Sequence, residues 1–181
     1  MAMPDREKLE DDRVLYQGTH LILRARGRWE YATRPVRQPA VGIVAITDDD
    51  RVVLVEQYRP PVEESVIELP AGLTGDVAGM EHESLVESAK RELLEETGYE
   101  AERWTELTRG YSSPGLTDEL IVLFLAEGLQ KRGAGGGDGT EGITIYEVPL
   151  DGVLDWLEQR GAKADLKLLA GICAAVKHRG K

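Results

Sequence analysis

The stretch from Glu68 to Tyr99 reads ELPAGLTGDVAGMEHESLVESAKRELLEETGY, and its second half is the most informative segment of the chain. From Glu87 to Glu96 the pattern predicts one helix. Thr97 and Gly98 end it, because glycine readily adopts the left-handed conformation found after helix C-termini. Apolar residues at helical spacing predict one buried stripe, made of Leu85, Ala89, Leu93 and Leu94.

Three glutamates lie on the polar side of this predicted helix. Glu92 and Glu96 are four residues apart and stack on one face, and Glu95 lies on the same side. Neighbouring carboxylates repel each other, and the C-terminal end of a helix dipole disfavours anions. A divalent cation relieves both costs, and Mg²⁺ suits the site because it binds a few carboxylates together with substrate phosphates. The spacing alone leaves a solvent-exposed acidic helix face as the alternative.

The same residues form a longer pattern that resembles the Nudix box. The family motif has a glycine where this chain has Val77, and we take Gly72 as its equivalent. The loop from Leu73 to His82 is then about five residues longer than usual, an insertion that costs little closure entropy. The matching residues are Glu83, Arg91-Glu92-Leu93, Glu95-Glu96 and Gly98-Tyr99.

The composition is that of an ordinary folded protein. The 181 residues are 41% hydrophobic and 30% charged, which suits one compact domain. The net charge of −11 disfavours nucleic acid and anionic membranes as partners, whereas bound cations would reverse the local sign for a phosphate substrate. Cys173 is the only cysteine and is expected in the core. We expect no signal peptide or membrane span, and therefore a cytoplasmic location.

Apolar and alternating segments predict strands on both sides of the first helix, and two helices near the end of the chain. The strands are Val14–Tyr16, Thr19–Arg24, Gly27–Arg34, Ala40–Thr47, Arg51–Tyr58, Ser65–Leu69, Trp104–Tyr111, Leu120–Ala126 and Ile143–Val148. The helices are Leu150–Gln159 and Asp165–Lys177, the second with an apolar face of Leu166, Leu169, Ala170, Cys173 and Val176.

The segment from Gly128 to Gly142 contains GAGGGDGTEG and has almost nothing to bury, so we expect a flexible loop. A passive linker is one interpretation. The other is a lid that closes on substrate and carries Asp138 or Glu141 as its active carboxylate.

Beyond the box, the chain resembles the ADP-ribose pyrophosphatase branch of the Nudix hydrolases, from about Trp29 to Lys177. The similar segments are VEQYRPP, SSPG-x-T-x-E, GITIYEV and DLKLLAG. The resemblance implies an α/β fold: an α/β/α sandwich around a mixed β-sheet, with a small N-terminal antiparallel β region. It further implies that this region, residues 1–38, contributes to a homodimer and that residues 39–181 form the hydrolase domain.

The resemblance also implies an activity, the metal-dependent hydrolysis of the diphosphate linkage of a nucleoside diphosphate derivative. ADP-ribose would give AMP and ribose 5-phosphate, with Mg²⁺ as the cofactor and Mn²⁺ as an alternative. Nucleoside-diphosphate sugars such as GDP-mannose, other ADP or UDP sugars and dinucleotides are alternative substrates. A non-catalytic sensor that binds ADP-ribose is an alternative of another class, which the complete set of box carboxylates disfavours.

Site residues follow from the resemblance position by position. Glu92 and Glu96 are the expected metal ligands, with Glu95 close by and the Ala71 carbonyl as a backbone ligand. Glu83 and Arg91 are expected to orient the ligands, and Gly72 and Gly98 to have structural roles in the motif.

The remaining expected residues contact the substrate or the attacking water. Arg59 would bind the diphosphate. Glu141 is the first choice for the base, Glu119 is the alternative, and Glu95 is a further catalytic candidate. The residues expected to contact the rest of the substrate are Trp29, Glu30 and Tyr31 for adenine, and Ser113, Pro114 and Gly115 in the following loop.

Overall fold

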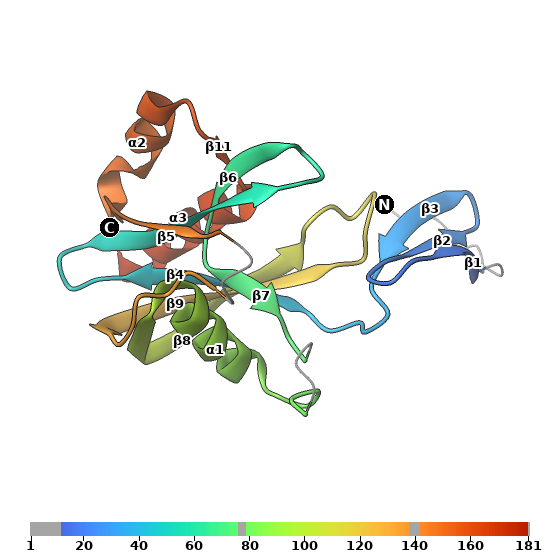
Figure 1. Ribbon diagram of the computed structural model, residues 1–181, viewed down its shortest axis with the longest axis horizontal. Helices are drawn as coiled ribbons and strands as arrows, with labels where there is room; N and C mark the ends of the chain where they lie inside the picture. The colour runs from blue at the N-terminus through green and yellow to red at the C-terminus, as the bar shows by residue number, and fades with distance from the viewer. Residues whose placement is uncertain (1–11, 76–78, 138–141, 181) are drawn as a thin grey trace, which may run out of the picture.

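A mixed sheet of eight strands forms the centre of the molecule (Figure 1). The computed structural model describes residues 12–75, 79–137 and 142–180. The main strand order is β11-β6-β5-β4-β9-β8; β4 and β9 run parallel, as do β11 and β6. The strands are β4 (Ala40–Ile46), β5 (Arg51–Arg59), β6 (Glu64–Glu68), β7 (Ala71–Leu73), β8 (Tyr99–Tyr111), β9 (Leu120–Lys131), β10 (Thr144–Pro149) and β11 (Lys163–Ala164).

Helices cover both faces of this sheet. Side chains of β4 alternate between the two faces: Ile43 packs in the cluster that contains Leu93 of α1 (Leu85–Thr97), and Val44 packs in the cluster that contains Leu168 of α3 (Leu166–Arg179). A 3₁₀ turn (Leu150–Gly152) and α2 (Val153–Arg160) join the α3 side. The predicted α/β/α sandwich is therefore confirmed. None of the described helices is long and apolar enough to cross a membrane.

The predicted stripe of α1 is correct except at its last member. Ala89 and Leu93 are fully buried, whereas Leu94 is 38% exposed. Consecutive helical residues point about 100° apart, so only one of Leu93 and Leu94 can face the sheet. Leu94 lines a surface cavity together with Trp104 instead.

The apolar face predicted for α3 is wrong except at Val176, which is partly buried against the core. Its buried residues are Leu168, Gly171 and Ala175. A Cβ on Gly171 would come within 2.8 Å of Leu69 Cδ1 and 2.9 Å of Val44 Cγ2, so small residues let the helix approach the sheet closely. The larger apolar residues are left outside; Leu166 is 77% exposed. Leu169, Ala170 and Cys173, expected in the core, are exposed as well.

The hairpin of β8 and β9 is longer than predicted at its open end. Tyr99 pairs with Lys131 and Glu100 with Gln130, so strand pairing reaches directly to the end of α1. The predicted loop from Gly128 to Gly142 is therefore wrong for its first four residues, which belong to β9. Asp138 and Glu141, the two candidate lid carboxylates, lie outside the described residues.

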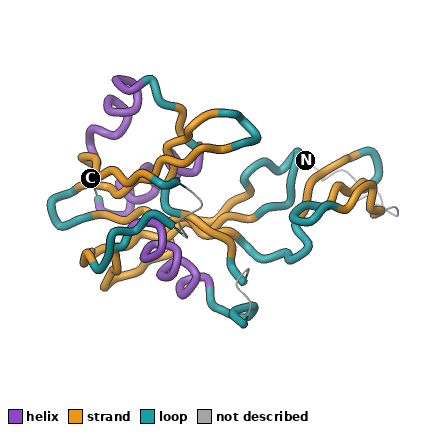
Figure 2. Tube along the Cα trace, in the orientation of Figure 1, coloured by secondary structure: helices purple, strands orange, loops and turns teal. Residues whose placement is uncertain are grey.

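A separate antiparallel sheet precedes the main one and projects away from it (Figures 1 and 2). Its strands are β1 (Asp12–Gln17), β2 (Ile22–Arg26) and β3 (Trp29–Thr33). The end of β3 is tied to the β8–β9 loop, because the Ala32 N–H donates to the Leu116 carbonyl at 2.8 Å and the Thr33 hydroxyl donates to Asp118 at 3.0 Å. The N-terminal β region expected from the sequence is thus present.

Candidate active site

Helix α1 holds two glutamates in fixed positions because both of its ends are capped. Ser84 accepts a hydrogen bond from the Glu87 N–H at the N-terminus, and Gly98 adopts φ +70° at the C-terminus. Ala89 and Leu93 fix the helix on the sheet. Glu92 and Glu96 are only 8% and 7% exposed, so both carboxylates are removed from solvent.

Strand β7 contacts both buried carboxylates. A Cβ on Gly72 would lie 2.0 Å from Glu92 Cδ, so the Glu92 carboxylate occupies the space that any other residue would fill. The Ala71 N–H donates a hydrogen bond to Glu96 Oε2 at 3.1 Å. The segment Pro70-Ala71-Gly72 therefore fixes both carboxylates from the side of the sheet.

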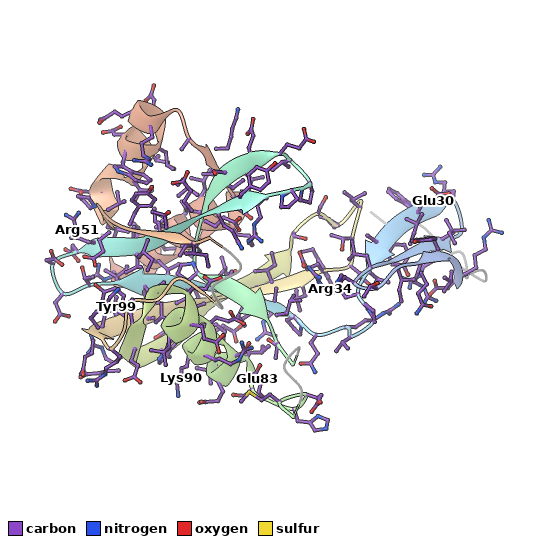
Figure 3. The ribbon with its side chains drawn as sticks, viewed as in Figure 1. Glu30, Arg34, Arg51, Glu83, Lys90 and Tyr99 are labelled. Carbon is purple, nitrogen blue, oxygen red and sulfur yellow. The ribbon has the colours of Figure 1, made fainter. Side chains whose placement is uncertain are left out.

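Arg91 links three glutamates of the motif. It donates to Glu83 at 3.0 Å, to Glu92 at 2.7 Å and to Glu95 at 3.3 Å. Burial lowers the pKa of Arg91, but hydrogen bonding to Glu83 and the charges of Glu92 and Glu83 outweigh this effect and raise the pKa. The Arg91 hydrogen bond in turn holds the pKa of Glu83 below its ordinary value. Figure 3 shows Glu83 beside the start of α1.

The buried pair of glutamates fits a hard divalent cation as a partial ligand set. The Glu95 side chain is 53% exposed and turns to Arg91. Within residues 12–75, 79–137 and 142–180, no three Asp, Glu, His or Cys side chains form a metal-binding group. The candidate metal ligands that remain are the carboxylates of Glu92 and Glu96 and the backbone of Ala71. Mg²⁺ commonly binds through one or two carboxylates and completes its shell with water and phosphate oxygens, so the donor set suits it.

Glu92 and Glu96 line a cavity of about 450 Å³. Two arginine–glutamate pairs line it as well. Arg59 binds Glu68 with both ends of its guanidinium, at 2.5 and 3.0 Å. Arg34 donates to Glu119 at 3.1 Å, and Figure 3 shows Arg34 where the chain leaves the N-terminal sheet. The structure thus brings together the predicted residues Arg59, Glu92, Glu96 and Glu119.

Acidic side chains outnumber basic ones in this cavity. Among the described residues, five acidic and three basic side chains line it. The acidic residues are Glu68, Glu92, Glu96, Glu119 and Asp165; the basic residues are Arg34, Arg59 and Lys167. An anionic phosphate ligand therefore needs additional positive charge to bind here, which bound cations supply.

Sequence reasoning missed four of these residues: Arg34, Glu68, Asp165 and Lys167. Glu68 had a readable signal, because it is a charged residue at the end of an apolar strand and shortly follows Arg59. The other three residues had no readable signal in the sequence, because separate elements bring them to the cavity.

The described part of the glycine-rich segment packs against the end of α1. The Gly136 N–H donates to the Glu96 carbonyl at 2.7 Å, and the Gly137 N–H donates to the Glu95 carbonyl at 3.0 Å. A Cβ on Gly135 would lie 2.4 Å from the Thr97 carbonyl carbon. Gly136 and Gly137 donate to carbonyls of the last helical turn, which have no partner within the helix, so residues 135–137 support the turn that bears Glu96.

A second cavity, of about 320 Å³, lies between the N-terminal sheet and the β8–β9 loop. Trp29, Tyr31, Pro114 and Gly115 line it, together with Tyr111, which the sequence reasoning had not selected. Ser113 forms the neighbouring turn through its carbonyl, and Glu30 is exposed on β3. Neither of these two lines the cavity.

Comparison with known proteins places this geometry in a family. A model described as "NUDIX domain" matches residues 36–170, which is more than half of the chain. The solved structure titled "Crystal structure of ADP compounds hydrolase" has a TM-score of 0.74 over 94% of each chain, at 23% sequence identity. At that identity the likeness shows the fold alone.

Three curated relatives align with part of the chain. The chain is 42% identical over 127 residues to the methanol dehydrogenase activator of Bacillus methanolicus and 38% identical over 130 residues to the ADP-ribose pyrophosphatase of Bacillus subtilis (strain 168). It is 35% identical over 115 residues to the GDP-mannose pyrophosphatase of Escherichia coli O1:K1 / APEC. These matches cover 69%, 69% and 59% of this chain, and 66%, 66% and 57% of the relatives.

The chain thus spans just under two thirds of the length of the first two relatives. Enzymes with this domain generally depend on a divalent metal. The family model and the relatives indicate the same family, and the buried glutamates of α1 are consistent with it. The chain therefore belongs to the Nudix family.

Proposed function

We propose that the protein hydrolyses the diphosphate linkage of a nucleoside diphosphate derivative, with ADP-ribose as substrate and AMP and ribose 5-phosphate as products. The observation that carries this proposal is one cavity in which two buried glutamates, Glu92 and Glu96, lie with the arginine Arg59. The relative named ADP-ribose pyrophosphatase supports the choice of substrate.

The cofactor in this proposal is Mg²⁺, with Mn²⁺ as an alternative. Glu92, Glu96 and the backbone of Ala71 would hold it. When bound, the ion neutralises phosphate charge and makes a bound water more acidic.

The side chains of the protein orient and activate the reactants. Arg59 can bind phosphate oxygens through its planar guanidinium. The oxygen of a water molecule attacks one phosphorus, and the bond from that phosphorus to the bridging oxygen breaks. A carboxylate accepts the proton of the water. Glu119 lies in the cavity beside Arg34. Glu141, the first choice from the sequence, lies outside the described residues.

Recognition of the adenine base is assigned to the second cavity. Trp29, Tyr31 and Tyr111 offer aromatic faces on which a base can stack. Arg26 fixes the Tyr31 ring: it donates to the hydroxyl at 2.9 Å and its guanidinium lies 5.2 Å from the ring centroid.

The homodimer is also part of the proposal. A three-stranded sheet needs a buried hydrophobic face to be stable in water, and β1 to β3 leave Val14, Tyr16 and Leu23 exposed. A second copy of the chain would cover this apolar surface. The division at residue 38 between the N-terminal β region and the hydrolase domain, and the cytoplasmic location, stay predictions from the sequence.

Two alternatives have specific support. The relative named GDP-mannose pyrophosphatase favours a sugar nucleotide as substrate. The relative named methanol dehydrogenase activator supports the alternative of a sensor that binds ADP-ribose and regulates a partner.

A substrate panel tests the proposal. Phosphate release through a coupled phosphatase is measured for ADP-ribose, ADP-glucose, GDP-mannose, UDP-glucose, NADH and diadenosine polyphosphates, in Mg²⁺, in Mn²⁺ and with EDTA. Preference for ADP-ribose that EDTA abolishes is the expected result. Equal turnover of sugar nucleotides would reject the adenine-specific reading, and binding of ADP-ribose without turnover would favour the sensor.

A further inference from the structure

The first turn of α3 reaches the active-site cavity through its attachment to strand β6. Lys163 and Ala164 of β11 pair in parallel with Val66 and Ile67 of β6. The Asp165 N–H then donates to the Ile67 carbonyl at 3.0 Å. The next residue on β6 is Glu68, the partner of Arg59. This register brings residue 165 to the level of the Arg59–Glu68 pair.

Asp165 also fixes Lys167. One oxygen of its carboxylate accepts the Lys167 backbone N–H at 2.7 Å, which caps the helix, and the other forms an ion pair with the Lys167 ammonium group. The two side chains are only 23% and 26% exposed. Both line the cavity that contains Glu92 and Glu96. A lysine ammonium is therefore kept at the active site by a carboxylate that the helix cap holds in place.

We propose that Lys167 is a cationic contact of the substrate's diphosphate beside Arg59, and that Asp165 is the positioning residue that keeps it there. The inference rests on the proposed function and deepens it. An ammonium group is a compact point charge that suits phosphate oxygens.

Electrostatic proximity supports this placement. Hydrogen bonding to Glu68 raises the pKa of Arg59, and the negative charges of Glu68, Glu96 and Asp165 contribute in the same direction. Asp165 is therefore close enough to influence the guanidinium assigned to the diphosphate. Lys167, paired with Asp165, lines the same cavity as Arg59.

A neighbouring cavity of about 510 Å³ shares three lining residues with the active-site cavity. Ile121, Asp165 and Lys167 line both cavities. Thr108 and Leu166 line only the neighbouring cavity. The neighbouring cavity has room for a group beyond the diphosphate. If Lys167 binds the diphosphate, its substitution should lower kcat/KM by the same factor for all substrates. If it binds the group beyond the diphosphate, the factor should differ between substrates.

The experiment compares K167M, K167R and the matched control K163M, whose lysine is exposed on β11. Steady-state kinetics with ADP-ribose, ADP-glucose and GDP-mannose in Mg²⁺ is combined with thermal unfolding. K167M is expected to lower kcat/KM by roughly 10- to 100-fold, by a similar factor for each substrate that the wild type hydrolyses, as for the loss of a charged hydrogen bond. K167R should recover most of this loss, and K163M should match the wild type.

D165N tests the positioning role separately. Asparagine caps a helix as well as aspartate does, so the melting temperature should be unchanged. Loss of the ion pair should lower kcat/KM by roughly threefold or more, a smaller effect than that of K167M. A D165N enzyme with wild-type kinetics would overturn the role of Asp165.

Failure of this inference can be told apart from failure of the proposed function. An active wild type whose K167M variant stays within twofold, or loses activity with one sugar only, overturns the Lys167 assignment alone. If the wild type binds ADP-ribose without turnover, calorimetry tests the Lys167 assignment, and K167M must then bind ADP-ribose more weakly than the wild type. A wild type that neither binds nor hydrolyses any of the three compounds overturns both.

Discussion

Replacing Gly72 by alanine should damage the active site while leaving the fold intact. The new Cβ would lie 2.0 Å from Glu92 Cδ and 2.1 Å from its Oε1. Carbon atoms in contact need about 3.5 Å, so the carboxylate must move by about 1.5 Å. Displacement of a catalytic group by about 1 Å can cost roughly 100-fold in rate, equivalent to about 2.7 kcal/mol of activation free energy. Stability should change little, because the group that moves is the end of a flexible side chain.

The assay is kcat/KM for ADP-ribose over a range of Mg²⁺ concentrations, with thermal unfolding measured on the same samples. Gly152→Ala is the matched control, because its Cβ would meet only Pro149 Cβ, at 3.8 Å. We expect loss of activity and weaker dependence on Mg²⁺ for Gly72→Ala, and wild-type values for the control. A folded Gly72→Ala enzyme within threefold of wild type would refute the requirement for Glu92 at this position.

Three further predictions concern the glutamates and the segment that supports them. Glu96→Gln should lower kcat by at least roughly 100-fold without lowering the melting temperature, and near-normal turnover would remove Glu96 from the metal site. Gly135→Ala should lower the free energy of unfolding by about 2 kcal/mol in urea denaturation, because its φ is +72° and its Cβ would meet the backbone of Thr97. Gly133→Ala is the control and should cost less, because Gly133 has open space at its Cβ and is not among the residues with positive φ. Glu83 has a lowered pKa, so its contribution to stability is present above its ordinary value of 4.5 and is lost as the pH falls through the lower folded value. Glu83→Gln should accordingly show a shallower loss of urea stability between about pH 5 and about pH 3, and an unchanged slope would contradict the Arg91 pairing.

Local sequence was sufficient to predict the helix that bears Glu92 and Glu96. Glu92 and Glu96 share a face because of helical periodicity, and Gly98 marks the C-terminal end through its conformational preference. The N-terminal end was predicted two residues late, because Ser84, which caps the helix before Leu85, was not selected. The strands around it followed from apolar runs. The expectation that Gly72 matters was also available from the motif, but the reason is tertiary: Glu92 fills the space beside it.

Packing distance decided which face of α3 is buried. Apolar count favoured Leu166 and Leu169, but the sheet selects Gly171 and Ala175, because small residues allow the close approach. Likewise β9 extends through Gly128 because its partner, the start of β8, lies directly after α1. Neither result depends on a local preference, so neither was visible in the sequence.

The sequence by itself determined the helix on which Glu92 and Glu96 share one face, and most of the strands that surround it. Only the tertiary structure brought Arg34, Glu68, Asp165 and Lys167 into the same cavity. These residues come from segments far apart along the chain, and strand pairing places them together. Periodicity and capping act within a few residues, whereas the register between β6 and β11 depends on contacts that form only when the chain has folded.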